Sequence, residues 1–345
     1  GFRTVEEMVG RTDILQASER AKNHWKASQL DLSKLLYQVD GVRTKQQEQN
    51  HGIDDSFDMI HLLQDAAPAI EHGEKVEVTY HIKNTDRVVG TIVGSDISRK
   101  YGEQGLLDDT VKFNFIGAAG QSFGAFIPRG MTMTCTGDVN DYFGKGLSGG
   151  KLVAIAPIKG EQEKNVIGGN VCLYGATSGK VFMNGRAGHR FAVRNSGANI
   201  VVEGIGDHGL EYMTGGRVVI LGDTGKNFAA GMSGGIAYVL PTNEAEFKAL
   251  CNMEMIRFEQ LESHAEKEAV RQLIIEHLNE TGSNKALDVL ATWEDCVKRF
   301  VKVVPTDYQA MLDEMEHFKL QGFNEKEAAL QAFAKATGTE YAASK

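Results

Sequence analysis

The sequence predicts a mainly β protein with helical flanks, in which a parallel β-helix (a solenoid) is followed by a C-terminal helical tail. Two observations favour this fold class. First, 27 of the 39 glycines lie between Gly117 and Gly235, so one third of the chain holds more than two thirds of its glycine. Second, short apolar segments recur in the same stretch at a nearly constant interval. A repeat of this kind indicates an array of similar structural units.

The interval is read from equivalent points in four apolar segments. Val181, Ile200, Val218 and Ile236 recur with a period of about 18 to 19 residues. This period is too short for a helical hairpin or a propeller blade, and it suits one coil of a parallel β-helix. Each segment begins or ends at glycine because tight corners require positive φ angles, which glycine adopts without steric cost.

The chain before the repeat divides into two parts. Residues 1–55 are polar and weakly periodic, which is typical of a junction or linker. Residues 56–73 carry apolar side chains at helical spacing, with Gly73 as a helix end. From there the composition favours short strands, which we expect at residues 74–82, 86–94, 110–117, 122–128 and 131–137. The predicted domains are therefore a junction (1–55), a β-helix domain (56–241) and a helical region (242–345).

The last hundred residues lose the glycine rhythm and become helical. Thr242 or Asn243 can cap a first helix, and residues 257–283 form a long amphipathic pattern ending near Gly282. Further helices are expected over 284–300 and 307–337, on either side of Pro305. We expect a pair of these helices to cover the open end of the β-helix, where the last strand would be unpaired.

Composition excludes several classes of function. The net charge is −9, and the tail contributes −7 of it with 19 acidic and 12 basic residues, so a nucleic-acid or anionic-lipid partner is not expected. No apolar run reaches the roughly 18 residues that a membrane span requires. The four cysteines have neither a disulfide nor a zinc or iron–sulfur spacing, which indicates buried free thiols in a reducing, cytoplasmic setting (Cys135, Cys172, Cys251 and Cys296).

The strongest motif resembles a dinucleotide fingerprint. Residues 204–209 read GIGDHG, and Asp223 stands at the end of the following apolar segment, about 20 residues after Gly204. A dinucleotide fold needs a crossover helix next, but only seven residues separate Gly209 from Arg217. We therefore interpret this motif as two successive corners of the repeat.

Other motifs give no stronger signal. The sequence has no P-loop, no G-x-S-x-G and no H-E-x-x-H. His189 and His208 are one repeat period apart and could stack on adjacent coils, but two histidines without a third ligand predict polar corners rather than a metal site. We predict no catalytic, cofactor-binding or metal-binding residue in this chain.

A resemblance to a known family covers nearly the whole chain. The sequence closely resembles the C-terminal (GXGXG) portion of the glutamate synthase large (alpha) subunit. The segment beginning NFIGAAGQSFGAFIPRGMTMTCTGDVNDYFGKGLSGG and the long stretch from GGNVCLYGATSG to GMSGG carry most of it. The flanks match as well, and the matching stretches are 6–15, 84–94, 99–115, 114–157, 168–235 and 299–312.

The resemblance implies a fold and a reaction. The family's domain is a right-handed β-helix without catalytic residues, and its enzyme converts glutamine, 2-oxoglutarate and two electrons into two glutamates, for nitrogen assimilation. FMN and a 3Fe–4S cluster are expected in missing upstream domains and no cofactor in this chain. The implied partners are the FMN-binding synthase domain, the glutamine amidotransferase domain and the small subunit. Because residue 1 is Gly and the closely spaced cluster cysteines are absent, no family site residue is carried over.

Three hypotheses about the function follow from these observations. The first is a structural part of glutamate synthase that braces its catalytic domains and is inactive alone. The second is a separately encoded docking subunit of a split enzyme or a related solenoid subunit. The third is a stand-alone nucleotide-binding enzyme that uses GIGDHG, which binding of NAD(P)H or FAD would reveal. The sequence leaves the electron donor open between NADPH, NADH and ferredoxin, and it does not give the oligomeric state.

Overall fold

A computed structural model describes residues 1–157 and 165–338, which fall into two compact units. The first unit, Gly1–Gly52, holds only short helical turns, and none of its side chains is buried. These turns are α1 (Val5–Met8), η1 (Thr12–Ile14), α2 (Glu19–Lys22) and η2 (Ala27–Gln29). The second unit begins at Ile53 and holds the sheet and the long helices. The sequence-based domain limits at 55/56 and 241/242 stay predictions.

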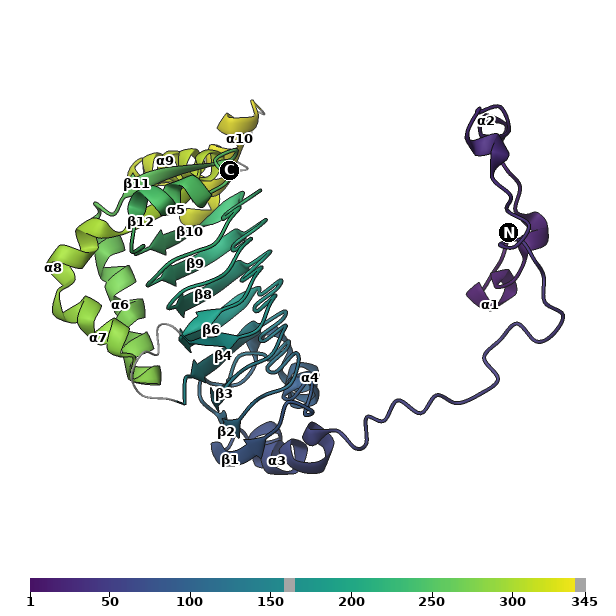
Figure 1. Cartoon of the computed structure of the whole chain (residues 1–345), viewed down its shortest axis with the longest axis horizontal. Helices are drawn as coiled ribbons and strands as arrows, with labels where there is room; N and C mark the ends of the chain where they lie inside the picture. Colours follow the sequence, from purple (N-terminus) through teal and green to yellow (C-terminus); the bar gives the residue numbers. More distant parts are fainter. Residues whose placement is uncertain (158–164, 339–345) are drawn as a thin grey trace. The chain divides into compact units, whose positions relative to one another are not determined.

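A ten-stranded sheet dominates the second unit (Figure 1). Its first eight strands are parallel and follow one another in chain order, whereas the last two are antiparallel to their neighbours. In spatial order the strands are β1 (Val76–Ile82), β2 (Val111–Gly117), β3 (Met131–Thr136), β4 (Ser148–Ile155), β6 (Ser178–Asn184), β8 (Ser196–Val202), β9 (Thr214–Ile220), β10 (Gly234–Val239), β12 (Val301–Pro305) and β11 (Ile256–Gln260). A second, two-stranded sheet pairs β5 (Val166–Gly168) with β7 (Arg186–Ala187).

The predicted mainly β, right-handed parallel β-helix (solenoid) is wrong. The described residues form a mixed α/β fold, in which each repeat contributes one strand to a single, mostly parallel sheet and its remaining residues are largely turns. The predicted helical tail is wrong in part as well, because β11 and β12 lie within it. The prediction was wrong because the glycine period indicates only where the backbone turns. It does not determine whether the residues between turns pair into further sheets.

The positions of the repeated strands are confirmed. The four apolar segments predicted around Val181, Ile200, Val218 and Ile236 lie in or overlap strands, from β6 to β10. Val181, Ile200 and Val218 are direct partners across β6, β8 and β9. The fourth point is displaced by one residue, because the pairing shifts between Gly234 and Ile236 and brings Ala237 opposite Val218.

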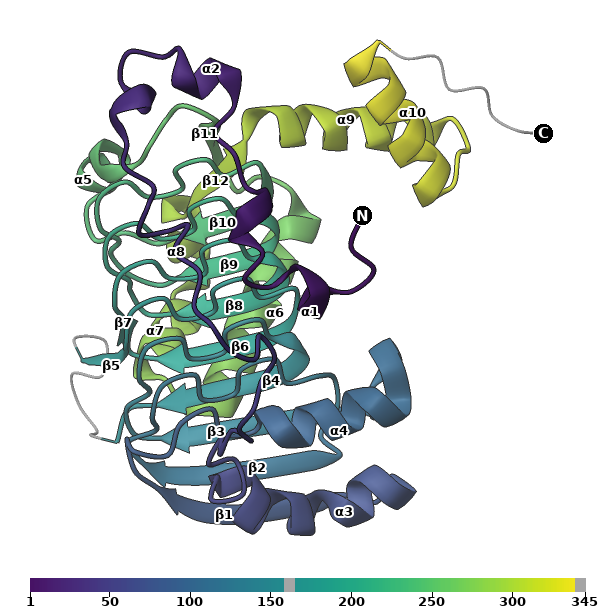
Figure 2. The same cartoon turned by 90° about the vertical axis from the view of Figure 1, so that its right-hand side faces the viewer.

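The turns of neighbouring repeats are hydrogen bonded to one another. Within one turn, every second residue has a positive φ angle, as at Arg190 (59°), Ala192 (52°) and Arg194 (59°). This alternation points successive N–H groups to opposite sides. Arg190 N donates forward to Asp207 O at 2.8 Å, and Ala192 N donates backward to Cys172 O at 2.8 Å. The stacked turns, which lie in front of the strands in Figure 2, therefore form a second hydrogen-bonded wall without being strands.

Two sequence-predicted strands are helix or turn instead. Residues 86–94 lead into α4 (Thr91–Tyr101), and residues 122–128 form a turn of the wall with Phe126 at φ 60°. The predicted helix at 56–73 is confirmed as a π-helical turn, η3 (Asp58–Leu62), followed by α3 (Leu63–His72). It ends at Gly73, whose φ of 71° is left-handed, as predicted.

The start of α4 depends on a distant residue. The Asp58 carboxylate accepts hydrogen bonds from Gly90 N at 2.7 Å and from Ile92 N at 2.8 Å, and so satisfies N–H groups that the helix leaves free. Asp58 is 2% exposed. Burial raises its pKa, against the opposing effect of these hydrogen bonds. The cap is 32 residues away from Gly90, so no local sequence pattern marks it.

The helices after β10 cover a face of the sheet rather than its end. The predicted helix 257–283 starts only at His264, because β11 occupies its first residues, and it ends at Gly282 as predicted. This helix, α6 (His264–Thr281), has 18 residues and is about 27 Å long. Crossing from β12 to β4 takes five strand spacings, or about 24 Å. The expected helix pair at the open end is replaced by β12, which pairs with the free edge of β10.

Shorter helices follow α6, and those within residues 284–299 complete this layer. The expected helix 284–300 is divided into α7 (Asn284–Ala291), α8 (Trp293–Cys296) and η6 (Val297–Arg299), and 307–337 into α9 (Thr306–Leu320) and α10 (Glu325–Thr337). Two further short helices are η4 (Gly102–Gln104) and α5 (Glu244–Leu250). None of the helices in residues 1–157 and 165–338 combines the length and apolar character that crossing a bilayer requires.

Alternating residues of the strands from β4 to β10 face two different apolar layers. Val218 and Ile220 of β9 face the inner layer, between the sheet and the wall of turns. Val219 and Leu221 face the outer layer, between the sheet and α6, α7 and α8. These strands are thus buried on both sides, as parallel strands usually are, whereas alternate residues of β1, such as Glu77 and Thr79, are exposed.

Candidate functional site

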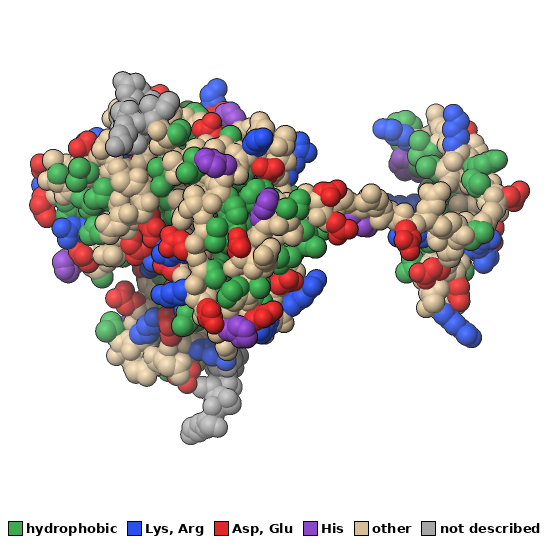
Figure 3. Space-filling view, turned by 90° about the horizontal axis from the view of Figure 1, so that it is seen from below, with side chains coloured by type: hydrophobic (Ala, Val, Ile, Leu, Met, Phe, Trp, Pro, Cys, Tyr) green, Lys and Arg blue, Asp and Glu red, His purple; other side chains and the backbone are tan. Residues whose placement is uncertain are grey.

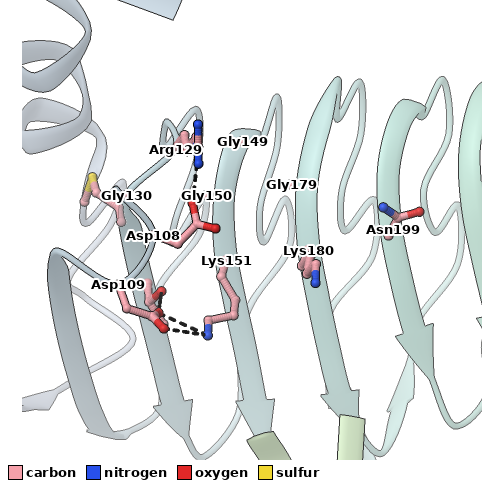
Figure 4. A pocket seen from close by; sticks show the side chains of 12 residues that line it. Asp108, Asp109, Arg129, Gly130, Gly149, Gly150, Lys151, Gly179, Lys180 and Asn199 are labelled. Carbon is pink, nitrogen blue, oxygen red and sulfur yellow. Dashed lines mark hydrogen bonds and ion pairs between the residues drawn. The ribbon is translucent and has the colours of Figure 1, made fainter. Parts of the chain in front are cut away.

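A groove of the second unit lies over the starts of β3, β4, β6 and β8. It has a volume of about 330 Å³. Four glycines form much of its floor, so that no side chain fills it (Figure 4). Its lining residues are Asp108, Asp109, Arg129, Gly130, Met131, Thr132, Gly149, Gly150, Lys151, Gly179, Lys180 and Asn199.

Lys151 is the central charge of the groove. Its Nζ lies 3.0 Å from Asp109 Oδ1 and 2.7 Å from Glu280 Oε1, and its side chain is only 20% exposed. Burial lowers the pKa of Lys151, but the hydrogen bonds to Glu280 and Asp109 outweigh this and raise it above its usual value. Burial likewise raises the pKa of Asp109, and the bonds from Thr132 (2.6 Å) and Lys151 outweigh it and lower that pKa. Both groups are therefore held in their charged forms.

The other two basic residues of the groove are also paired. Lys180 Nζ lies 2.6 Å from Glu276 Oε2, and Arg129 Nε lies 2.9 Å from Asp108 Oδ1. Because Glu276 and Glu280 are one helical turn apart, they match lysines on the adjacent strands β4 and β6. These ion pairs hold the end of α6 on the sheet, and they leave each cation of the groove already neutralised.

A histidine, a serine and a glutamate meet under α6. Glu203 and His277 are 3% and 0% exposed, and His277 Nε2 lies 3.3 Å from Glu203 Oε1. Ser283 Oγ donates to the same oxygen, and it accepts a bond from Ala286 N at 2.9 Å. In a catalytic triad the histidine would bond the serine, whereas here both bond the carboxylate. The cluster therefore ties α6 and α7 to the end of β8, and it does not activate a nucleophile.

All four cysteines are free thiols, and three of them are buried as predicted, whereas Cys251 is partly exposed. Cys135 and Cys172 are fully buried, and burial raises the pKa of each to about 12. The pKa of Cys251 is raised to about 12 by burial as well. A thiol with a raised pKa is a poor nucleophile and a poor metal ligand at neutral pH. Among the described residues, no three His, Cys, Asp or Glu side chains are grouped so that they could hold a metal ion.

The GIGDHG segment is a turn, as predicted. Residues 203–213, all of which the structure describes, lead from β8 into β9 without a helix. Asp207 lies opposite His189, with its backbone N donating to His189 Nδ1 at 2.9 Å. His208 is one residue further along and bonds Glu211 Oε1 at 2.7 Å. The two histidines therefore do not occupy equivalent positions.

The sequence did not identify the groove residues. Asp109, Lys151 and Glu280 come from three distant parts of the chain, and only the parallel register and the crossing of α6 bring them together. A usable signal existed in the repeated Ser-Gly step before Lys151 and Lys180, which places both lysines at equivalent strand positions. On the face seen in Figure 3, acidic and basic side chains are interspersed rather than segregated. The prediction that the chain has no catalytic, cofactor or metal residue stays a prediction.

The sequence of this chain is similar to one protein family and to several known proteins. The GXGXG motif family matches residues 58–306. The NADPH glutamate synthase large chain of Bacillus subtilis is 58% identical over 96% of this chain and 22% of its own length. The NADH glutamate synthase of Schizosaccharomyces pombe is 48% identical over 91% of this chain and 15% of its own length. The ferredoxin-dependent glutamate synthase 2 of Synechocystis is 42% identical over 88% of this chain and 20% of its own length. The chain thus spans about a fifth of the length of these relatives.

Proposed function

The chain belongs to the GXGXG motif family, and from this we propose that it is the non-catalytic scaffold of a glutamate synthase large chain. The parent reaction would convert glutamine, 2-oxoglutarate and two electrons into two glutamates. In that enzyme this chain would fix the separation of the amidotransferase and FMN-binding synthase domains. The small subunit is a further proposed partner, and the cytoplasm is the proposed location.

The observation that carries the proposal is the closed, two-sided packing of the sheet. Apolar layers fill both of its faces from β4 to β10, and the ends of the array are covered by α3 and by β12. A close-packed interior of this kind deforms little, which suits a spacer between two active sites. The charged groups of the groove are paired with one another, so they support binding of α6 rather than chemistry on a substrate.

The cofactors of the parent enzyme do not fit the described residues. A 3Fe–4S cluster needs several nearby thiolates, whereas Cys135 and Cys172 are buried with raised pKa values and no three potential ligands are grouped among the described residues. An FMN phosphate would need a free cation or helix terminus, whereas Lys151, Lys180 and Arg129 each face a carboxylate. We therefore propose that FMN and the cluster bind elsewhere in the parent protein.

A chimaera tests this function. The matching segment of the Bacillus subtilis large chain would be replaced by this chain, and glutamine-dependent reduction of 2-oxoglutarate would be measured with NADPH, NADH and reduced ferredoxin. We expect the chimaera to be active and the 345-residue chain alone to give no turnover. Turnover by the chain alone, or an inactive chimaera that retains its FMN and cluster, would refute the scaffold role.

A further inference from the structure

Four polar side chains form a continuous column along the wall of turns. Each accepts a hydrogen bond from the backbone N–H of the equivalent residue in the next repeat. Asn170 N donates to Asp141 Oδ1 at 2.7 Å, and His189 N donates to Asn170 Oδ1 at 2.9 Å. Asp207 N then donates to His189 Nδ1 at 2.9 Å, and Lys226 N to Asp207 Oδ1 at 2.8 Å. We call Asp141, Asn170, His189 and Asp207 the acceptor column.

The residue that follows each member of the column binds the same backbone residue of the next repeat. It donates its N–H to the carbonyl of that residue, whereas the column member accepts from its N–H. Arg190 N donates to the carbonyl of Asp207 at 2.8 Å, while His189 Nδ1 binds the N–H of Asp207. His208 N donates to Lys226 O at 2.8 Å in the same way. Both Arg190 and His208 have positive φ angles, 59° and 63°, and both N–H groups donate forward, to the next repeat. Each backbone unit in the column is therefore bound at both its N–H and its C=O, as in a β-ladder, with a side-chain atom replacing one carbonyl.

A glycine precedes each receiving residue because the acceptor, together with the backbone of the preceding repeat, occupies the space of its side chain. A Cβ on Gly206 would lie 2.7 Å from His189 Nδ1, and a Cβ on Gly188 would lie 2.6 Å from Asn170 Oδ1. On Gly169 and Gly225 the corresponding distances, to Asp141 Oδ1 and Asp207 Oδ1, are 2.5 and 2.2 Å. Real Cβ atoms do not approach other heavy atoms this closely, so these positions require glycine whatever their φ angle.

We propose that the acceptor column is a register lock: each side-chain acceptor selects one backbone N–H of the next repeat, and the glycine before that N–H admits no other alignment. A slip of one residue would place a side chain against the acceptor and leave the N–H unpaired. That N–H would lose its hydrogen bond to the preceding repeat, which is a modest loss because these bonds are exposed to water. What the position requires is an acceptor atom, which carboxylate, amide and neutral imidazole all supply. The neutral His189 that accepts at Nδ1 carries its proton on Nε2.

The test replaces the histidine and measures the hydrogen bond directly. The side chain of His189 is 60% exposed, so its loss creates no cavity. His189→Leu removes the acceptor, and His189→Asn keeps one at the equivalent position, as Asn170 already does. The readout is the amide exchange rate of Asp207 in the whole chain, divided by that of Val201 in β8, which corrects for any change in global stability. The adjacent exposed residue supplies the control variant, Arg190→Leu, which introduces the same side chain without removing an acceptor of the column.

We expect the relative protection of Asp207 to fall about tenfold in His189→Leu, as loss of one hydrogen bond predicts, and to stay unchanged in His189→Asn and Arg190→Leu. Unchanged protection in His189→Leu would overturn the proposal, and so would equal loss in His189→Asn. A second measurement uses Gly206→Ala, whose effect on the melting temperature should be smaller in a His189→Ala background than in the wild type. Equal shifts in the two backgrounds would show that the glycine does not serve the acceptor.

Discussion

Replacing Val219 by Asp tests whether the sheet separates two independent apolar layers. Val219 is fully buried in the outer layer under α6, whereas its neighbour Val218 faces the inner layer. Burying a valine side chain contributes about 1.5–3 kcal/mol, and an unpaired buried carboxylate costs several kcal/mol more. The sum of about 5 kcal/mol or more is comparable with the whole stability of a small domain.

We expect the protein to avoid this cost locally. The α6 helix reaches the sheet through the outer layer and through ion pairs that are partly exposed, such as Lys151 with Glu280 at 20% and 33%. Detaching α6 would hydrate the introduced carboxylate and leave the inner layer intact. The Val219→Asp variant should therefore lose the outer layer first, while Val218→Asp should unfold both layers together.

Tryptophan fluorescence can measure the separate loss of the outer layer. Trp25 is 76% exposed and lies in the first unit, so Trp25→Phe leaves Trp293, which packs against the outer layer, as the reporter. In that background Val219→Asp should shift the emission to the red without denaturant, while the amides of β9 stay protected from exchange. Val219→Thr is the matched control of nearly equal volume, and it should change both signals little. Loss of β9 protection together with the emission shift would refute the two-layer reasoning.

Two further predictions concern polar contacts. Asp58→Asn should lower the free energy of unfolding by about 1–3 kcal/mol in a urea titration, because an amide NH₂ then faces an N–H of α4, whereas the exposed Asp55→Asn should change it little. Lys302 is paired with Glu266 at 3.0 Å and with Glu259 at 3.1 Å. Burial lowers the pKa of Lys302, but the bonds to Glu266 and Glu259 outweigh this and raise it. Burial raises the pKa of Glu259, but the bonds from Arg257 and Lys302 outweigh this and lower it. The stability difference between wild type and Lys302→Met, about 1–3 kcal/mol, should hold from about pH 5 to 10. It should shrink in acid as Glu259 is protonated and in alkali as Lys302 is deprotonated, and a difference that grows in acid would contradict this account.

The strands of the repeat could be predicted because each has a local cause. The apolar cores of β6, β8 and β9 are short β-branched segments between glycines, and their spacing gave the correct partners Val181, Ile200 and Val218. The bulge before Ile236 shifted the next pairing by one residue, because two consecutive glycines allow a backbone irregularity that spacing alone does not show.

The fold class was predicted wrongly because the backbone conformation of the turns is not visible in the sequence. Leu210 and Tyr212 adopt left-handed backbone conformations at φ 58° and 54°, which neither residue type indicates in a sequence. Their conformations are imposed by hydrogen bonds to the neighbouring repeats, such as Tyr212 N to Ala230 O at 2.9 Å. A context of this kind exists only once the repeats are stacked, so the sequence does not distinguish stacked turns of this kind from the corners of a β-helix.

The site depends on contacts that join distant segments. Lys151 and Glu280 meet across 129 residues, and Asp58 caps α4 through Gly90, which follows it by 32 residues. In each case the sequence shows an ordinary charged residue with no local partner. These contacts become apparent only after the register of the sheet and the path of α6 are known.

The dinucleotide-like motif shows how one glycine pattern can have two physical causes. In a dinucleotide fold, the second glycine of G-x-G-x-x-G allows the backbone to approach a pyrophosphate. Here the second glycine, Gly206, makes room for the imidazole of His189 in the preceding repeat, whose Nδ1 would lie 2.7 Å from an added Cβ. The ligand is replaced by a side chain of the same chain, and the N–H of Asp207 that could face a phosphate bonds that imidazole. A Gly-x-Gly step therefore indicates close approach to the backbone, and the residue one repeat earlier identifies what approaches.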